Sequence, residues 1–191
     1  MSKVTWLHLS DIHFQAKTEW RANSTREALI AFLVNKFEKD PSLKPDFITC
    51  TGDIAFGETG ADPLAEQYKL AKSFFRDVLA ICDLNKKQLF MVPGNHDINR
   101  QAVSGAFQRG LVAMAKESAK FVDGINQGYE TKNKDTRDAM ERLADYELFI
   151  KQYAKHLQDI EGRCFYTKKL DINGINIGIA GFNSVWSCAG E

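Results

Sequence analysis

Long apolar runs and paired cysteines are both missing from this sequence. No apolar stretch approaches the roughly 20 residues of a membrane span, and the N-terminal MSKVTWLHLSDIH reaches polar residues too early for a signal peptide. The cysteines form no C-x-x-C pair and no cluster with histidine; they are Cys50, Cys82, Cys164 and Cys188. We therefore expect reduced, partly buried thiols in a cytoplasmic protein that does not enter the membrane.

An excess of charge of one sign is also missing. The 25 Lys and Arg residues balance 25 Asp and Glu residues, so the formal net charge is zero. A domain that holds nucleic acid mainly by its phosphates is usually basic, so the balance disfavours that class. A small phosphate ester or a nucleotide end stays open as a substrate. The length of 191 residues, with 44% apolar residues, fits one domain with a proper core.

The first half of the chain alternates between strand and helix patterns. The first strand, VTWLHL, is apolar enough for burial on both faces. This order predicts parallel strands with right-handed crossovers in an α/β fold. The three expected strands are Val4–Leu9, Asp46–Cys50 and Gln88–Val92.

Two helices are expected between these strands. The first starts with an S-x-x-E capping box formed by Ser24 and Glu27. The second starts with Asp62 as the N-cap and Pro63 at the first helical position. The apolar face of the first helix is expected to consist of Leu29, Phe32, Leu33 and Phe37.

The pattern changes after the third strand. Residues 102–157 are polar and helical in period, which predicts a helical insertion that either exposes a solvated face or caps the strand ends. Asn173-Gly174 between two apolar runs predicts a β-hairpin. We expect His8 to be a packed core histidine and His156 to be exposed. The chain stops soon after a buried-looking strand, so we expect residues 1–191 to be a truncated domain of a longer protein.

Polar clusters follow each of the first three strands. Asp11 and His13 follow the first strand, Asp53 follows the second, and Asn95, His96 and Asp97 follow the third. Ligands of open α/β sheets bind beyond the carboxyl ends of the strands. Carboxylate, imidazole and amide ligands without thiolate suit two divalent ions, for which Mn, Fe and Zn are the candidates.

These clusters resemble the first three motifs of the calcineurin-like metallophosphoesterase superfamily. The motifs are D-x-H at Asp11 and His13, G-D at Gly52 and Asp53, and G-N-H-D at Gly94 to Asp97. Their order and spacing are similar to the family pattern over roughly the first half of the chain. The resemblance implies the N-terminal part of an αββα sandwich and two divalent metal ions, with Mn²⁺ expected ahead of Fe or Zn.

By the same resemblance, each residue takes a role. Asp11 and His13 would bind the first ion, Asp53 would bridge both ions, and Asn95 would bind the second. His96 would stabilise charge at the phosphate or protonate the leaving oxygen, while Asp97 would orient its ring.

The family's later G-H and G-H-x-H motifs are absent from this chain, so its metal shells are expected to be incomplete and its hydrolysis weak. The expected function is hydrolysis of phosphomonoesters or phosphodiesters by a hydroxide activated by two metals. The opening LHLSDIHF also resembles DNA-repair nucleases, although the neutral charge counts against nucleic acid. The alternative is a regulatory or interaction module with an incomplete metal site, fused to a C-terminal effector region.

Overall fold

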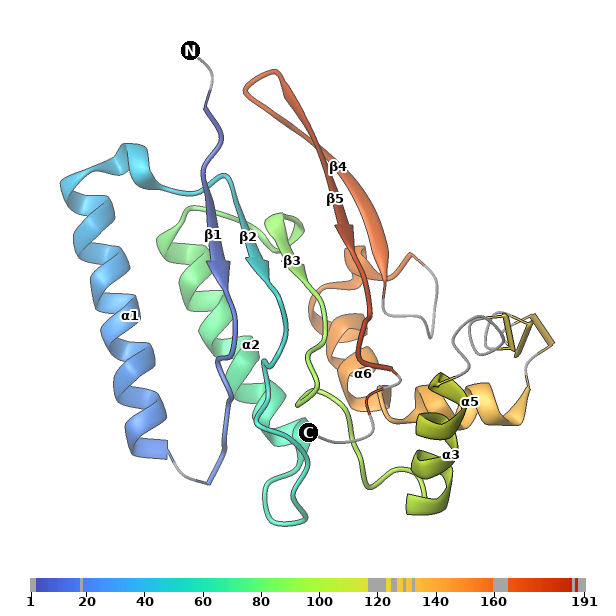
Figure 1. The fold of residues 1–191 in the computed structure, drawn as a ribbon. Coiled ribbons are helices and arrows are strands. Elements are labelled where there is room, and N and C mark those ends of the chain that lie inside the picture. Colours follow the sequence, from blue (N-terminus) through green and yellow to red (C-terminus); the bar gives the residue numbers. More distant parts are fainter. Residues whose placement is uncertain are drawn as a thin grey trace.

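The computed structural model shows two small sheets with helices packed around them (Figure 1). For residues 19–23, 111, 115 and 135 only the backbone is described. No helix in the described ranges is long and apolar enough to cross a membrane. The described residues are 3–17, 19–116, 123–124, 127–128, 130–131, 133–159, 165–186 and 188.

Three parallel strands form the first sheet, in the order β1-β2-β3. The register pairs Trp6 with Phe47 and Ile48 with Leu89. This arrangement confirms the predicted α/β class and the β-α-β-α-β order. Each strand is shorter than its apolar run; the strands are β1 (Trp6–Leu9), β2 (Phe47–Cys50) and β3 (Leu89–Met91).

Helices α1 (Glu19–Lys39) and α2 (Leu64–Ile81) lie side by side against this sheet (Figure 1). Two predicted helix starts are wrong. Helix α1 begins five residues before Ser24, so Ser24 lies inside the helix. At α2, the Leu64 N–H donates to Glu58 Oε2 at 2.9 Å, while Asp62 Oδ2 accepts from the Ala16 N–H at 2.9 Å. Asp62 therefore fixes the loop after β1 rather than the helix.

The predicted apolar face of α1 holds in part. Leu33 and Phe37 are buried and Leu29 is partly buried, as expected for residues four apart on one stripe. Phe32 is 55% exposed, and Lys36 Nζ lies 5.6 Å from the centre of its ring. Phe32 is one residue, or about 100°, off the stripe, which puts it outside the core.

Burial of β1 on both faces is wrong. Leu9 is buried, but Trp6 is 59% exposed and His8 is also exposed. The His8 Nε2 atom lies 2.7 Å from Thr51 Oγ1, so His8 is not a packed core histidine. Exposure alternates along β1, with Trp6 and His8 exposed and Leu7 and Leu9 partly or fully buried, so only one face of this strand is covered.

Helices follow β3, as predicted: α3 (Gly105–Ala115), α5 (Lys134–Glu141) and α6 (Ala144–Tyr153). Figure 1 shows α3 and α5 at the end of the sheet toward which the strands run. Helix α6 is not a solvated face, because Phe149 stacks on Tyr68 of α2 with ring centres 4.6 Å apart. The second half of the insertion therefore belongs to the core, and a capping role stays a prediction.

The predicted hairpin forms the second sheet. Strands β4 (Tyr166–Ile172) and β5 (Ile175–Gly181) pair antiparallel around Asn173 and Gly174, whose φ angles are 54° and 80°. Positive φ at both turn residues is the geometry that Asn-Gly favours. Tyr166 packs beside Phe90 of β3 with ring centres 6.3 Å apart, which places the hairpin against the first sheet.

Among the described cysteines, Cys50, Cys82 and Cys188 are free, as expected; Cys164 lies outside the described residues.

His156 is half-buried rather than exposed. Its Nε2 lies 3.1 Å from the carbonyl oxygen of Leu89 in β3, and its ring packs edge-on to Phe90 with centres 6.0 Å apart. Because a carbonyl only accepts, Nε2–H is the donor. Burial lowers the pKa of His156, although the Leu89 carbonyl partly opposes this shift.

This shift predicts a loss of stability in mild acid. Between the lowered folded-state pKa and the unfolded value of about 6.5, the unfolded chain binds more protons. The free energy of unfolding should therefore fall as pH drops below about 6.5. Urea unfolding at several pH values gives the free energy of unfolding as a function of pH. This dependence should be weaker in His156→Gln than in the wild type. The matched control is His8→Gln, which removes an exposed imidazole. An unchanged pH dependence in His156→Gln would contradict the assignment.

Candidate metal centre

The loops after β1 and β2 continue the pairing of their strands. The N–H groups of Asp11, His13 and Phe14 donate to the carbonyls of Gly52, Asp53 and Ile54 at 3.2, 3.0 and 2.9 Å. This ladder holds the D-x-H segment alongside the G-D segment beyond the point where the regular strands end. Two of the three predicted clusters are thus fixed to each other by their backbones.

Backbone strain is concentrated in the same two loops. Asp11, His13 and Asp53 all have positive φ angles, at 55°, 51° and 51°. The left-handed conformation costs a residue with a Cβ about 1–2 kcal/mol. Such strain persists only where surrounding contacts enforce it, and it is typical of functional sites. The ladder supplies those contacts, so the strain marks these three predicted ligands.

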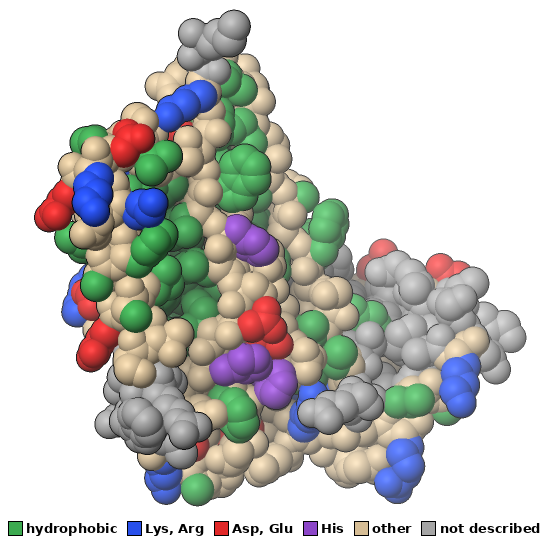
Figure 2. All heavy atoms as spheres, turned by 60° about the vertical axis from the view of Figure 1, so that its left-hand side comes forward, with side chains coloured by type: hydrophobic (Ala, Val, Ile, Leu, Met, Phe, Trp, Pro, Cys, Tyr) green, Lys and Arg blue, Asp and Glu red, His purple; other side chains and the backbone are tan. Residues whose placement is uncertain are grey.

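The side chains of this centre meet at distances suited to a shared ion. His13 Nε2 lies 4.0 Å from Asp11 Oδ1 and 4.0 Å from Asp53 Oδ2. One ligand atom each from His13, Asp53 and His96 lies within 4.8 Å of the other two. These separations are too long for hydrogen bonds. Two ligands about 2 Å from a common cation lie at most about 4 Å apart, so small side-chain shifts would bring these groups onto a shared ion. Figure 2 shows acidic and histidine side chains gathered on this face.

His13 itself fits a metal ligand. Its Nδ1 is buried and has no hydrogen-bond partner among the described residues. A buried polar atom without a partner is costly, so Nδ1 needs a ligand of its own, while Nε2 is the ring nitrogen that faces the two carboxylates. The rings of His13 and His96 lie 4.7 Å apart, nearly perpendicular at 85°. The donor set of imidazole and carboxylate therefore fits a divalent cation.

His96 is held by partners that the sequence did not reveal. Its backbone N–H donates to Asp53 Oδ1 at 3.0 Å, which leaves Asp53 Oδ2 facing His13. Its ring Nδ1 is hydrogen-bonded to the carbonyl oxygen of Phe56. A carbonyl accepts only, so Nδ1 carries a proton, and Nε2 is the ring nitrogen available to exchange a proton.

The predicted contact between Asp97 and His96 is wrong. The Asp97 carboxylate is fully buried and accepts from the N–H groups of Ala55 (2.9 Å), Ile54 (3.1 Å) and Gly94 (2.9 Å). It also accepts from the Tyr68 hydroxyl at 3.1 Å. Adjacent side chains at a turn point in different directions, so Asp97 faces inward while His96 faces the site. Asp97 joins the loops of β2 and β3 to α2.

Burial raises the pKa of Asp97 to about 6, and the hydrogen bonds from Ala55, Gly94, Ile54 and Tyr68 act in the opposite direction.

Two glycines allow these loops to touch. Gly52 has a φ of 103°, and a Cβ there would lie 2.7 Å from the Gly94 Cα. A Cβ on Gly94 would lie 2.1 Å from Asp53 Oδ1 and 2.2 Å from the Asp53 nitrogen. The first glycine of the G-D motif and that of the G-N-H-D motif are therefore needed for close packing, and Gly94 leaves the space that Asp53 occupies.

Asn95 lies in the same loop, between Gly94 and His96, and is partly buried. Its carbonyl oxygen is 3.5 Å from Arg100 Nη2. Its role as a ligand stays a prediction. Sequence reasoning missed Phe56, Tyr68 and Arg100. The position of Arg100, three residues after the G-N-H-D motif, was the signal for that residue.

The Asp97 network makes a prediction about stability. Asp97→Asn keeps one acceptor oxygen and turns an NH₂ group toward N–H donors, so we expect a loss of about 3 kcal/mol or more in the free energy of unfolding. Tyr68→Phe removes one of the four donors and should cost only about 1 kcal/mol. Chemical denaturation measures both. A loss in Asp97→Asn no larger than in Tyr68→Phe would contradict the network.

The close approach of the loops makes a prediction about metal binding. Gly94→Ala should displace Asp53 and weaken Mn²⁺ binding about tenfold or more, since the new methyl group overlaps the carboxylate. Calorimetric titration with Mn²⁺ measures the effect. Gly60→Ala is the control, because a Cβ at Gly60 meets nothing within 4 Å. Equal Mn²⁺ affinity in the two variants would show that Gly94 does not protect the position of Asp53.

Known proteins are similar to this chain in sequence. A protein of Bacillus subtilis (strain 168), named "Uncharacterized metallophosphoesterase-like protein YydB", is 34% identical over 99 residues. That stretch makes up 51% of this chain and 18% of the relative, so the matched region spans less than a fifth of the relative's length. The family model for calcineurin-like phosphoesterases matches residues 4–174, which include all three strand-end loops and the strands that carry them. The chain therefore belongs to the calcineurin-like phosphoesterase family.

Proposed function

We propose that this chain provides the metal-binding loops of a hydrolase that cleaves phosphomonoesters or phosphodiesters. The observation that carries the proposal is the convergence, from three separate loops, of the proposed ligands His13 and Asp53 with the proposed proton donor His96. Members of the family use divalent metals, and the donor set here fits them. Nucleotides and nucleic acids are within the proposed substrate class.

The proposed ligand roles follow the order of the loops. Asp11 and His13 would hold a first ion, Asp53 would hold both ions, and Asn95 would contribute its amide oxygen to the second ion. Asp53 suits a bridging role because Oδ1 is fixed by the His96 N–H while Oδ2 faces His13. Two bound divalent cations, with Mn²⁺ proposed ahead of Fe or Zn, neutralise phosphoryl oxygens and lower the pKa of an attacking water.

His96 is proposed as the proton donor to the leaving oxygen. Its Nδ1–H is engaged by the Phe56 carbonyl, so the proton that it exchanges with substrate is the one on Nε2. The Phe56 carbonyl holds the ring at Nδ1, and the backbone N–H of His96 is anchored on Asp53 Oδ1. Asp97 acts at a distance by holding the loop, without touching the ring.

The strained backbone argues against a purely regulatory module. Three predicted ligands with positive φ cost the fold stability, and a site without a bound ion has no use for that cost. Helices α3 and α5 lie at the same end of the sheet (Figure 1), which supports a proposed role of residues 102–157 as a cap over the substrate.

Asp53→Ala tests the function directly. Removing the bridging carboxylate should lower kcat/KM for bis-p-nitrophenyl phosphate, measured with added Mn²⁺ on the full natural polypeptide, on the order of 10²–10³-fold. Asp77→Ala, which removes an exposed carboxylate on α2, is the matched control and should keep the wild-type value. Wild-type activity in Asp53→Ala would refute the proposed centre.

A further inference from the structure

A positively charged side chain, Arg100, lies beside this acidic centre and, among the described residues, has no carboxylate partner. Arg100 is partly buried, and its Nη2 lies 3.5 Å from the carbonyl oxygen of Asn95, at the outer limit of a hydrogen bond. Among the described residues, no carboxylate forms an ion pair with Arg100. The guanidinium has five N–H donors, so the weak contact to Asn95 leaves most of them available.

The backbone of Arg100 is held more firmly than its side chain. The Asn99 N–H donates to the Arg142 carbonyl at 2.7 Å, and Gln108 Nε2 on α3 donates to the Arg100 carbonyl at 2.6 Å. The Gln101 N–H donates to Asn99 Oδ1 at 3.0 Å. These bonds fix the turn that returns the side chain toward Asn95. A residue anchored by its backbone with a weakly engaged charged end is well suited to bind a ligand.

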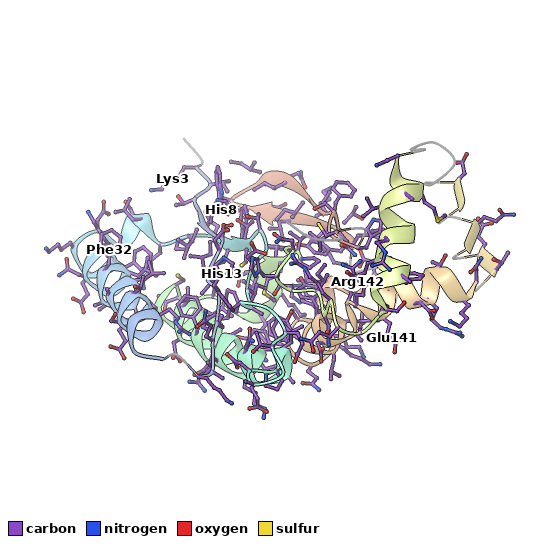
Figure 3. The ribbon with its side chains drawn as sticks, turned by 60° about the horizontal axis from the view of Figure 1, so that its bottom comes forward. Lys3, His8, His13, Phe32, Glu141 and Arg142 are labelled. Atoms are coloured by element: carbon purple, nitrogen blue, oxygen red, sulfur yellow. The ribbon has the colours of Figure 1, made fainter. Side chains whose placement is uncertain are left out.

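A second, buried cation strengthens the positive field at this point. Arg142 is 0% exposed, and its Nε and Nη1 have no hydrogen-bond partner among the described residues, while Nη2 donates to the Cys188 carbonyl. Figure 3 shows Arg142 on the side of the molecule where α3 lies. Burial lowers the pKa of Arg142, and the positive charge of Arg100 adds to this effect. The Arg142 carbonyl accepts from the N–H of Asn99, the residue before Arg100, so both arginines belong to one part of the fold, where their charges favour an anion.

We propose that Arg100 binds a non-bridging phosphoryl oxygen of the substrate and so orients the phosphate on the metal centre. This inference rests on the proposed phosphoesterase function and adds a substrate-binding residue to it. A planar guanidinium can bind two phosphoryl oxygens at once, which an ammonium cannot do. Because Arg100 contacts the backbone of Asn95, it reaches the substrate from the side of the third loop, opposite the D-x-H loop.

The test compares Arg100→Gln and Arg100→Lys in the full natural polypeptide, loaded with Mn²⁺. Arg100→Gln should raise both the KM for p-nitrophenyl phosphate and the inhibition constant of inorganic phosphate about 10- to 100-fold, because a charge-assisted hydrogen bond is lost. Arg100→Lys should recover part of the loss. Arg76→Gln, which removes an exposed arginine on α2, is the control and should change neither constant more than about twofold.

The two proposals fail in different ways. Mn²⁺ content should be the same in all variants, since Arg100 does not bind the ions. An Arg100→Gln variant with the wild-type KM and the wild-type phosphate inhibition constant would overturn the role of Arg100 while leaving the function intact. A wild-type protein that neither hydrolyses phosphate esters nor binds phosphate would overturn both.

Discussion

The buried carboxylate of Asp97 is the interaction on which the rest of the centre depends. It satisfies three backbone N–H groups from two loops and the hydroxyl of Tyr68 on α2, all away from solvent. A buried network of this kind is rigid only when every member is paired, and here each donor finds an oxygen. Its effect is to hold the loops after β2 and β3 at the separation that lets Gly52 and Gly94 touch. The position of Asp53, and through it His96, follows from that contact.

The backbone of the first two loops adds a second constraint. Asp11, His13 and Asp53 adopt a conformation that L-residues avoid, and the ladder between the loops after β1 and β2 maintains it. The free energy for this strain comes from the core beneath, where the helices on the sheet bury Ile48, Leu89 and their neighbours. The result is a set of predicted ligands already close together, which would reduce the reorganisation that binding an ion requires.

The region after β3 serves both the core and the site. Helix α6 packs its aromatic residues against Tyr68, the same residue whose hydroxyl meets Asp97. The turn before α3 brings Arg100 back to the third loop. The Asn99 N–H in this turn donates to the carbonyl of Arg142, just before α6. Packing of α3 and α6 therefore bears on the geometry of the centre, although neither helix carries a predicted metal ligand.

The sequence by itself determined the features that depend on local pattern. The strand order, the three strand-end clusters and the Asn173-Gly174 turn could be predicted because strand period, glycine and turn chemistry act over a few residues. The tertiary structure decided the partners of Asp97 and His96, the exposure of His8 and Phe32, and the burial of His156 and Phe149. Most of these depend on contacts between residues about 40 or more apart in the chain. His96 and Asp97 are adjacent in one motif, and the sequence predicted a site role for both. Only the packed fold turns His96 toward the site and Asp97 into the core.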